Sequence, residues 1–185
     1  MKHILIVGEQ GVGKSTLLQK IVSQIGRPAF GFESVKADEA VDEENGSPIH
    51  VYEIKHSKRC GTPHLTGYCK RQRMKPIDRA FDCIAPLLTQ EIPTDGIWVL
   101  DELGVMEHRS NSQAFCSAVL ARLDGDTPVI AAVKDKSNPF LEAVRTHPNA
   151  KCFSVTPENR DLLEQEILAE CEVWRTSAKT IHKGL

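Results

Sequence analysis

Apolar runs suited to buried strands alternate along this chain with apolar residues at helical spacing. The strand-like runs are residues 4–7, 97–100, 128–133 and 152–155. Continuous apolar runs of this length are typical of strands that are buried on both faces of a parallel sheet. Because helical patterns separate these runs, we predict an α/β fold in which a mostly parallel sheet lies between two layers of helices.

Helical spacing of apolar residues marks several segments. They are residues 17–25, 77–88, 115–123 and 156–168, and a further short helix begins at Asn138-Pro139. Gly26 stands where the first helix should end, because glycine adopts the left-handed conformation that closes many helices. Pro86 is expected to kink or end the second helix, because proline removes a backbone donor.

Residues 30–75 interrupt this pattern. Two short strand candidates, residues 30–35 and 49–54, flank an acidic stretch that contains Asn45-Gly46, a dipeptide that favours a hairpin turn. Residues 55–75 are basic and follow no clear period, and we interpret them as a lid-like part of the same insertion.

Composition sets limits on the class of protein. The chain has 185 residues, of which 41% are hydrophobic and 26% charged, as in an ordinary globular domain. We expect one domain over residues 1–175 and a polar tail over residues 176–185. The net charge of -2 favours neither nucleic acid nor a membrane as a partner, and no apolar run approaches the roughly 18 residues of a membrane helix. The six cysteines are interpreted as thiols, so we expect a cytoplasmic protein.

The strongest motif lies between the first predicted strand and the first predicted helix. It fits G-x-x-x-x-G-K-[ST] with Gly8, Glu9, Gln10, Gly11, Val12, Gly13, Lys14 and Ser15. Backbone N–H groups of such a loop bind triphosphate oxygens, and the following helix presents its N-terminus to the same charge. We expect Lys14 to contact the β- and γ-phosphates, Ser15 to bind Mg2+, and Thr16 to add a phosphate contact. The motif and its context therefore predict that a nucleoside triphosphate, ATP or GTP, binds here.

Two acids end one of the predicted strands. Asp101 stands where a Walker B aspartate holds magnesium, often through a bound water. Glu102 is suited to orient or deprotonate the attacking water, and Glu107 is the next acid to consider for that role. The predicted catalytic residues are therefore Lys14, Asp101 and Glu102. The predicted metal ligands are Ser15 and Asp101.

The same acids begin a competing pattern. Asp101-Glu102-Leu103-Gly104 fits the D-x-x-G of GTPases, whose glycine responds to the γ-phosphate. Such proteins usually hold guanine with N-K-x-D, and the corresponding stretch here is Val133-Lys134-Asp135-Lys136. The mismatch disfavours a signalling GTPase.

The loop of residues 156–160 follows a late predicted strand. Ligands of open α/β sheets bind beyond the carboxyl ends of the strands. We therefore expect this loop, with Asn159 and Arg160, to lie beside the nucleotide base. Contacts made mostly by backbone and side-chain stems would select the base loosely.

Three blocks of the sequence resemble the P-loop nucleoside-triphosphatases that were first described from thermophiles and are also called cancer-related nucleoside-triphosphatases. The blocks are the phosphate loop, residues 99–107, and residues 128–161 with Asn138-Pro139-Phe140 and Thr156-Pro157-Glu158-Asn159-Arg160-Asp161 in the family's order. The resemblance implies a RecA-like sheet and hydrolysis of NTP to NDP and phosphate with broad base tolerance.

The middle of the chain departs from this family. Phe30-Gly31-Phe32 resembles the start of the family's hairpin, but the arginines expected soon after it are absent and Lys36 is the nearest basic residue. Residues 55–75 also differ in length and composition.

Two weaker groups of residues lie in the basic segment. His56, Cys60, His64 and Cys69 are of types that bind zinc, but their spacing matches no common zinc motif, so we favour a polar loop. The second group is the basic run of Lys70, Arg71, Arg73, Lys75 and Arg79. We interpret this run as a solvated face rather than a nucleic-acid site, and one of Arg71, Arg73 and Arg79 as a candidate arginine finger on the γ-phosphate.

Three functions fit these motifs. The leading one is a Mg2+-dependent nucleoside-triphosphatase. A small-molecule or nucleotide kinase is the second, with the basic segment as its lid, and transfer of phosphate to an acceptor would reveal it. A nucleotide-controlled binding switch is the third, and it would bind nucleotide tightly with negligible turnover. The preferred base and the oligomeric state are left open.

Overall fold

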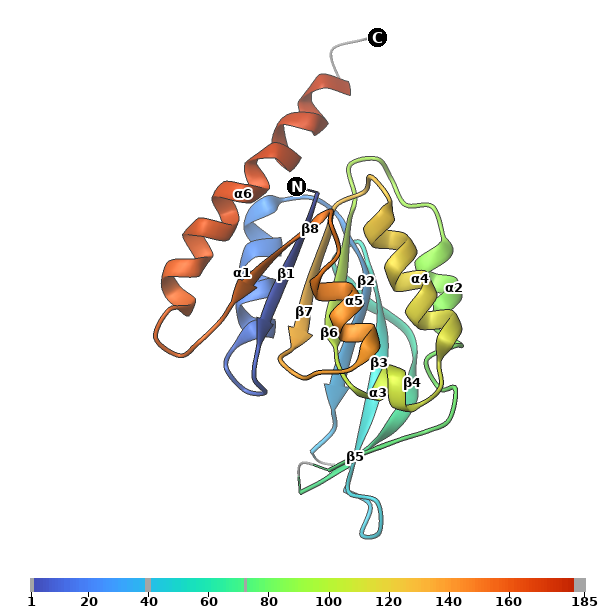
Figure 1. Ribbon diagram of the computed structural model, residues 1–185. Coiled ribbons are helices and arrows are strands. Elements are labelled where there is room, and N and C mark those ends of the chain that lie inside the picture. Colours follow the sequence, from blue (N-terminus) through green and yellow to red (C-terminus); the bar gives the residue numbers. More distant parts are fainter. Residues whose placement is uncertain (1, 39–40, 72, 182–185) are drawn as a thin grey trace.

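A parallel sheet forms the centre of the molecule. In this computed structural model, residues 2–38, 41–71 and 73–181 are described, with their side chains up to residue 174. Within these ranges the parallel strands are, in order across the sheet, β2 (Ala29–Lys36), β6 (Ile97–Leu103), β7 (Val129–Lys134), β1 (His3–Gly8) and β8 (Ala150–Ser154) (Figure 1). The predicted parallel core is confirmed, and the carboxyl ends of these strands point downward in Figure 1.

Antiparallel strands extend the sheet beyond β2. β3 (Ser47–Lys55) pairs with β2 as the predicted hairpin, and Gly46 in its turn has a φ of 93°. β4 (Lys58–Lys70) and β5 (Arg73–Pro76) follow, so residues 55–75 form strands where the sequence suggested an irregular lid-like segment. Most side chains of β4 are exposed or half-buried, and such a strand lacks the apolar alternation by which strands are recognised in a sequence.

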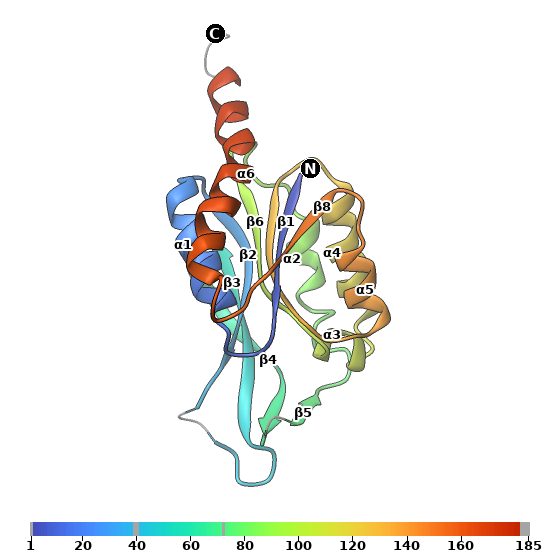
Figure 2. The ribbon, with the colours of Figure 1, turned by 60° about the vertical axis from the view of Figure 1, so that its left-hand side comes forward.

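Helices cover both faces of the sheet (Figure 2). α1 (Lys14–Ile25) and α6 (Arg160–Ile181) pack on one face. On the other face lie α2 (Ala85–Thr89), α4 (Gln113–Asp124) and α5 (Pro139–Arg145), while α3 (Met106–Arg109) lies near the carboxyl ends of the strands. Successive side chains of a strand point to opposite faces, so each face has its own apolar core, with Leu5 in one and Ile4 in the other. The predicted three-layer arrangement is confirmed.

The second predicted helix is shorter than its pattern suggested. Residues 77–84 form turns, and α2 begins at Ala85 with Pro86 in its first turn. Pro86 therefore begins a helix rather than kinking or ending one. The physical reason is that the first N–H groups of a helix have no partner inside the helix, so a proline there removes nothing.

The last helix also begins later than its pattern suggested. The Asn159 side chain accepts the Thr156 N–H at 2.8 Å and closes a turn, and α6 starts only at Arg160. The backbone of α6 continues to Ile181, into the segment predicted as a polar tail, and residues 182–185 lie outside the described part of the chain. None of the helices within the described ranges is both long and apolar enough to cross a membrane.

His3, at the start of β1, joins three elements through a neutral imidazole. Its Nε2 donates to the carbonyl of Leu123 near the end of α4 at 2.9 Å, and its Nδ1 accepts the N–H of Val129 at the start of β7 at 3.2 Å. Burial lowers the pKa of His3 from its usual 6.5. A proton on Nδ1 would face the Val129 N–H, so this site favours the uncharged ring.

We predict that the protein loses stability as the pH falls below the usual pKa of histidine, because the unfolded chain then binds a proton that the folded His3 does not. The contribution of His3 to the free energy of unfolding is complete above the usual pKa of histidine. It is lost as the pH falls toward the lower pKa that His3 has in the folded protein. His3→Gln keeps a donor and an acceptor but cannot be protonated. The urea midpoint should therefore fall less in His3→Gln than in the wild-type chain between about pH 8 and about pH 5. Equal falls would exclude His3 as the cause.

Candidate active site

The phosphate loop of residues 8–15 connects β1 to α1 and needs its glycines for two reasons. Gly11 and Gly13 have φ angles of 80° and 101°, which L side chains rarely adopt. At Gly8, a Cβ atom would lie 2.8 Å from the Val155 carbonyl oxygen, so a side chain would separate the loop from the chain beyond β8. The loop therefore wraps tightly at the N-terminus of α1, the position that favours an anion.

Lys14 is nearly fully buried, with 3% of its surface exposed. Its ammonium donates to the carbonyl oxygens of Gly8 at 2.9 Å and Glu9 at 2.7 Å. It also forms an ion pair with Glu102, whose Oε2 lies 3.1 Å away. The cation is thus held across its own loop and points at the end of β6.

Ser15 and Asp101 come together as predicted for a metal site. The Ser15 hydroxyl donates to Oδ1 of Asp101 at 2.8 Å, although the two residues lie on different elements, α1 and β6. Burial raises the pKa of Asp101 to about 6, with Glu102 and Glu33 adding to the rise, while the Ser15 hydrogen bond opposes it. The pair places two hard oxygen ligands side by side, which suits Mg2+.

Glu102 reaches the same side as Asp101 because the strand bulges there. On β7, Ala132 lies opposite Asp101 and Val133 lies opposite Leu103, so Glu102 is an extra residue in the register. A bulge of this kind breaks the alternation that would otherwise send neighbouring side chains to opposite faces. Both acids therefore line the same cavity at the phosphate loop.

Lys134, which ends β7 beside this bulge, was not selected from the sequence as a site residue. Its ammonium lies 2.9 Å from Oε1 of Glu102, so Glu102 is held between Lys134 and Lys14. Gly104 leaves room for it, since a Cβ there would lie 3.2 Å from Cδ of Lys134. The only available signal was its place at the end of an apolar strand in the parallel sheet.

Glu107 is 2% exposed and lies under the site rather than in it. Its Oε2 accepts the Gly104 N–H at 3.1 Å, and burial raises its pKa to about 7. Glu107 therefore holds the backbone that follows the bulge. This position makes it a weaker candidate than Glu102 for contact with a bound water.

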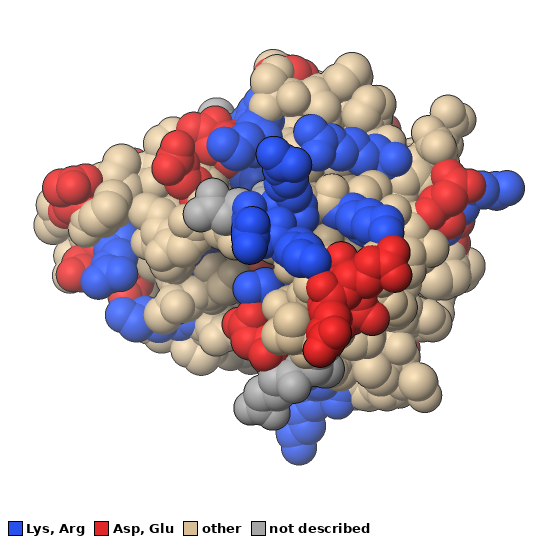
Figure 3. Space-filling model, turned by 90° about the horizontal axis from the view of Figure 1, so that it is seen from below, with Lys and Arg blue, Asp and Glu red and all other residues tan. Residues whose placement is uncertain are grey.

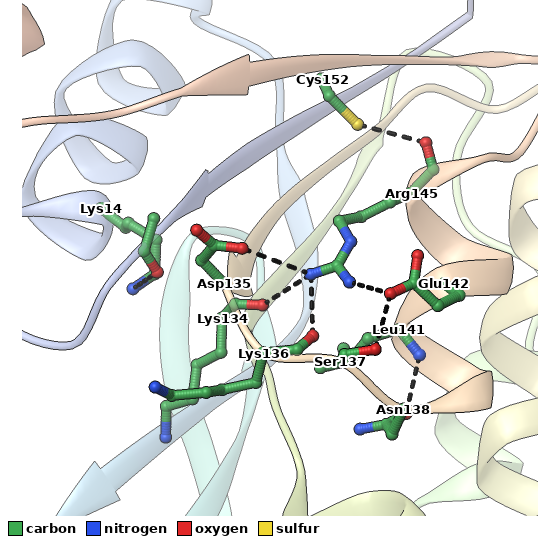
Figure 4. A network of polar contacts seen from close by, with 11 residues as sticks. Lys14, Lys134, Asp135, Lys136, Ser137, Asn138, Leu141, Glu142, Arg145 and Cys152 are labelled. Atoms are coloured by element: carbon green, nitrogen blue, oxygen red, sulfur yellow. Dashed lines mark hydrogen bonds and ion pairs between the residues drawn. The ribbon is translucent and has the colours of Figure 1, made fainter.

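The loop after β7 is fixed by Arg145 of α5 (Figure 4). The guanidinium donates to the carbonyl oxygens of Lys134 at 3.3 Å and Lys136 at 2.8 Å, and to Glu142 at 2.6 Å. At the far end of the loop, the Asn138 side chain caps α5 by accepting the Leu141 N–H at 2.9 Å. The side chains of Lys134 and Lys136 run in the same direction from this loop (Figure 4).

A cavity of about 330 Å³ joins most of the predicted residues. Its lining consists of Gln10, Gly11, Gly13, Lys14, Ser15, Thr16, Ser34, Asp101 and Glu102. Among these, Ser34 on β2 was not selected from the sequence. Gly8 and Val12 pack against each other within the loop and are not part of this lining. Glu9 lines a neighbouring cavity, together with Gln10 and Lys134.

Asn159 and Arg160 follow β8 near the phosphate loop, but their side chains make different contacts. Asn159 bonds to the backbone, accepting the Thr156 N–H and donating to the Ser154 carbonyl at 2.9 Å. Arg160 lies over Gly13, where a Cβ would be 3.5 Å from its guanidinium nitrogen, and it lines a small cavity with Thr16. Arg160 thus lines a cavity beside the phosphate loop, whereas Asn159 holds the backbone of its own loop.

The four candidate zinc ligands are spread along the antiparallel strands. His56 lies in the turn after β3 and packs on Phe30, with ring centroids 4.9 Å apart, and Cys69 is buried in the apolar core. Cys60 and Cys69 are nine residues apart on β4, roughly 30 Å at the rise of a strand. Within the described ranges, no three His, Cys, Asp or Glu side chains group as a metal site.

The three candidate arginine fingers have different surroundings. Arg79 is paired with Asp82 at 3.2 Å, and Arg71 lines a hollow with Glu44 on the antiparallel extension. Arg73, on β5, lines the cavity that contains Glu9 and Gln10 of the phosphate loop. Of the three, Arg73 alone lines a cavity beside that loop.

Known proteins resemble this chain in sequence and fold. The sequence model of the family described as NTPase matches residues 3–168. Nucleoside-triphosphatase THEP1 of Aquifex aeolicus (strain VF5) is 31% identical, with 91% of this chain and 98% of that relative covered. The cancer-related nucleoside-triphosphatase homolog of Bos taurus is 30% identical, with 92% and 97% covered. The crystal structure of THEP1 from Aquifex aeolicus matches with a TM-score of 0.69 at 26% identity, over 90% of this chain and 97% of that one. The resemblance seen in the sequence and the RecA-like fold it implies are confirmed.

We predict that Lys14→Ala weakens triphosphate binding by about 10- to 100-fold, the size of one or two charge-assisted hydrogen bonds. Lys2→Ala is the matched control, because Lys2 is exposed before the start of β1, at the opposite end of that strand from the loop, and its ammonium pairs at the surface with Asp126. Titration with a fluorescent triphosphate measures both variants, and thermal melting establishes that they fold. Wild-type affinity in a folded Lys14→Ala chain would remove the phosphate-loop assignment.

Proposed function

The chain belongs to the NTPase family, and we propose that it is a Mg2+-dependent nucleoside-triphosphatase that hydrolyses ATP, GTP or other NTPs to NDP and phosphate. The observation that carries this proposal is the position of two acids at the end of β6. Asp101 is hydrogen-bonded to Ser15 at 2.8 Å, and Glu102 is paired with Lys14 at 3.1 Å. A loop cation, a hydroxyl, a metal-binding carboxylate and a second carboxylate are the parts that hydrolysis by a P-loop protein requires.

Ser15 and Asp101 are the residues that would hold magnesium. Their oxygen atoms lie 2.8 Å apart at the mouth of the phosphate loop, and both are the hard ligands that Mg2+ prefers. A cation there would also relieve the unfavourable burial that raises the pKa of Asp101. When bound, the ion would supply positive charge that neutralises the triphosphate.

The hydrogen-bond partners of the Lys14 ammonium in this structure are weaker than those that a bound triphosphate would offer. Two of them are backbone carbonyls and the third is Glu102. Phosphate oxygens carry more charge than a carbonyl, so a bound triphosphate draws the ammonium toward the β- and γ-phosphates. Glu102 then loses one of its two cationic partners.

Glu102 is our candidate for the residue that orients and deprotonates the attacking water. Lys134 keeps hold of Oε1 at 2.9 Å when Lys14 turns to the phosphates, so the carboxylate stays beside the cavity with Oε2 free. A carboxylate oxygen fixed in this way can accept the proton that water loses as it attacks. Lys134 acts in this scheme as a positioning residue.

The loop of residues 156–160 is our candidate for the base site. Arg160 lies over Gly13, and its aliphatic stem would offer apolar contact rather than a set of base-specific donors and acceptors. Asn159 contacts the backbone of its own loop, which supports a structural role. Loose base selection, and hence use of several NTPs, fits such a site.

Arg73 is our candidate arginine finger, because it shares a cavity with Glu9 and Gln10 of the phosphate loop. A guanidinium there would stabilise charge on the γ-phosphate in the transition state.

We also propose a cytoplasmic location for the protein. The six cysteines are all free thiols, and thiols stay reduced in the cytoplasm.

The proposal is tested by turnover of several NTPs with and without Mg2+, together with Glu102→Gln. The amide keeps the shape of Glu102 and can hold water, but it cannot accept a proton. We expect nucleotide and magnesium to remain bound while the rate of hydrolysis falls by about 10²–10⁴, the usual size of a general-base effect.

Glu91→Gln is the matched control, because Glu91 is an exposed acid in the loop before β6. It should keep the wild-type rate. Full turnover by Glu102→Gln would show that Glu102 is structural, and Glu107 would then be the next acid to test. Absence of phosphate release by the wild-type chain with every NTP would overturn the proposed function.

A further inference from the structure

A second cavity adjoins the phosphate loop on the other side of Glu102. It has a volume of about 450 Å³, and its lining includes Arg73, Arg109, Lys134 and Lys136. Gln10 lines both this cavity and the one that contains Lys14. The second cavity is therefore distinct from the metal and loop site but directly beside it.

The basic side chains of this cavity come from separate parts of the chain. Arg73 lies on β5, Arg109 ends α3, and Lys134 and Lys136 end β7 and begin the next loop. The face of the molecule at the carboxyl ends of the parallel strands shows Lys and Arg side chains gathered near its centre (Figure 3). The sheet topology, rather than a single basic run in the sequence, produces this group of charges.

The cations outnumber the acids that neutralise them. Lys134 is paired with Glu102, but Arg73, Arg109 and Lys136 form no ion pair within the described part of the chain. The lining contributes two acids, Glu9 and Asp135, and Asp135 lies 3.8 Å from Arg145 outside the cavity. Like charges at close range repel, so the cavity as built favours an anion.

The lysine side of the cavity is held in place. Arg145 binds the carbonyl oxygens of Lys134 and Lys136, which fixes the backbone that carries both ammonium groups. Gly104 lets the stem of Lys134 lie against the end of β6. A prepared arrangement loses little freedom when an anion binds, which favours a specific site.

The cavity lies toward the γ-phosphate end of the nucleotide. Lys14 is the loop residue that contacts the β- and γ-phosphates, and Glu102 lies 3.1 Å from its ammonium. The opposite oxygen of Glu102 lies 2.9 Å from Lys134, which lines the second cavity. A single carboxylate and Gln10 thus separate the two cavities.

We propose that this second cavity, lined by Arg73, Arg109, Lys134 and Lys136, binds a phosphate dianion next to the γ-phosphate. This inference rests on the proposed function, because that function identifies the ligand of the neighbouring cavity as a nucleoside triphosphate. Guanidinium forks match the oxygens of a phosphate, and the lysines add point charges. The dianion has two sources, the inorganic phosphate that hydrolysis releases and the phosphate group of an ester that serves as phosphoryl acceptor.

The two sources differ in what attacks the γ-phosphorus. In hydrolysis the attacker is water, and the product phosphate passes into the cavity as the bond to the NDP oxygen breaks. In transfer, a hydroxyl of the bound ester forms the new P–O bond while the bond to the NDP oxygen breaks, and the hydroxyl proton goes to Glu102. NDP is the leaving group in both.

Binding of inorganic phosphate to the intact chain tests the proposal. The chain is first saturated with Mg2+ and a non-hydrolysable NTP, so that the phosphate loop is filled, and calorimetry then measures phosphate binding. We expect saturable binding that weakens about tenfold in Arg109→Met, the size of one charge-assisted contact. Lys136→Met, also at an exposed position, is the second variant and should weaken binding in the same direction.

Lys58→Met is the matched control, because it removes one exposed charge at the far end of β4. It should bind phosphate as the wild-type chain does. Binding that is absent, or equal in the wild-type chain and both cavity variants, overturns the proposal. Failure of NTP hydrolysis in a separate assay would overturn the proposed function, but it would not change the result of the phosphate-binding measurement.

Glycerol 3-phosphate distinguishes the sources of the dianion. Competition with inorganic phosphate, with transfer of label from γ-labelled ATP to the ester, assigns the cavity to an acceptor. Binding of inorganic phosphate alone, with label released only as phosphate, assigns it to the product. Both results support the anion site, and both should weaken together in Arg109→Met if the cavity is the site.

Discussion

The buried ammonium of Lys14 is the constraint on which the rest of the site depends. A buried charge is costly unless it is hydrogen-bonded and paired, and Lys14 meets that requirement with two loop carbonyls and Glu102. The carbonyls are available only because the glycines let the loop wrap around its own lysine. Glu102 is available only because β6 bulges beside β7. The loop, the bulge and the strand order are therefore parts of one solution to burying a cation that has to reach phosphate.

The antiparallel extension compensates for charge on the other side of the site. Glu33 of β2 lies opposite Asp101 of β6 in the parallel register, and its charge is one of those that raise the pKa of Asp101. Arg59 of β4 binds both oxygens of Glu33, at 2.6 and 2.8 Å, and also lies over the ring of Tyr52. The sequence lacks the arginines that the family resemblance led us to expect early in the hairpin. A cation comes instead from a later strand, which only the pairing of β3 with β4 brings to Glu33.

The difference between what sequence patterns predict and what they miss follows from this architecture. Motifs with fixed local spacing lie where the sequence predicted in the fold, the loop around Lys14 between β1 and α1 and the acids after residue 100 at the end of β6, because neighbouring residues determine their geometry. Lys134 and Arg73 were not linked to each other, because their proximity depends on strand order across the sheet. β4 was not predicted, because its side chains are mostly exposed and do not alternate between apolar and polar. The position of Pro86 in its helix was predicted wrongly, because proline can begin a helix as well as end one.

Lys134 resolves a conflict that the Lys14–Glu102 pair would otherwise create. A carboxylate paired with the loop lysine competes with the γ-phosphate for the same ammonium, and it would follow that ammonium when phosphate draws it away. A second cation on β7 gives Glu102 a partner that does not move with the substrate, since the backbone of Lys134 is held by Arg145. In the proposed mechanism, binding of the triphosphate therefore separates Glu102 from the loop cation without displacing Glu102. The same lysine also lines the basic cavity, so the charge that positions Glu102 also contributes to the proposed anion site.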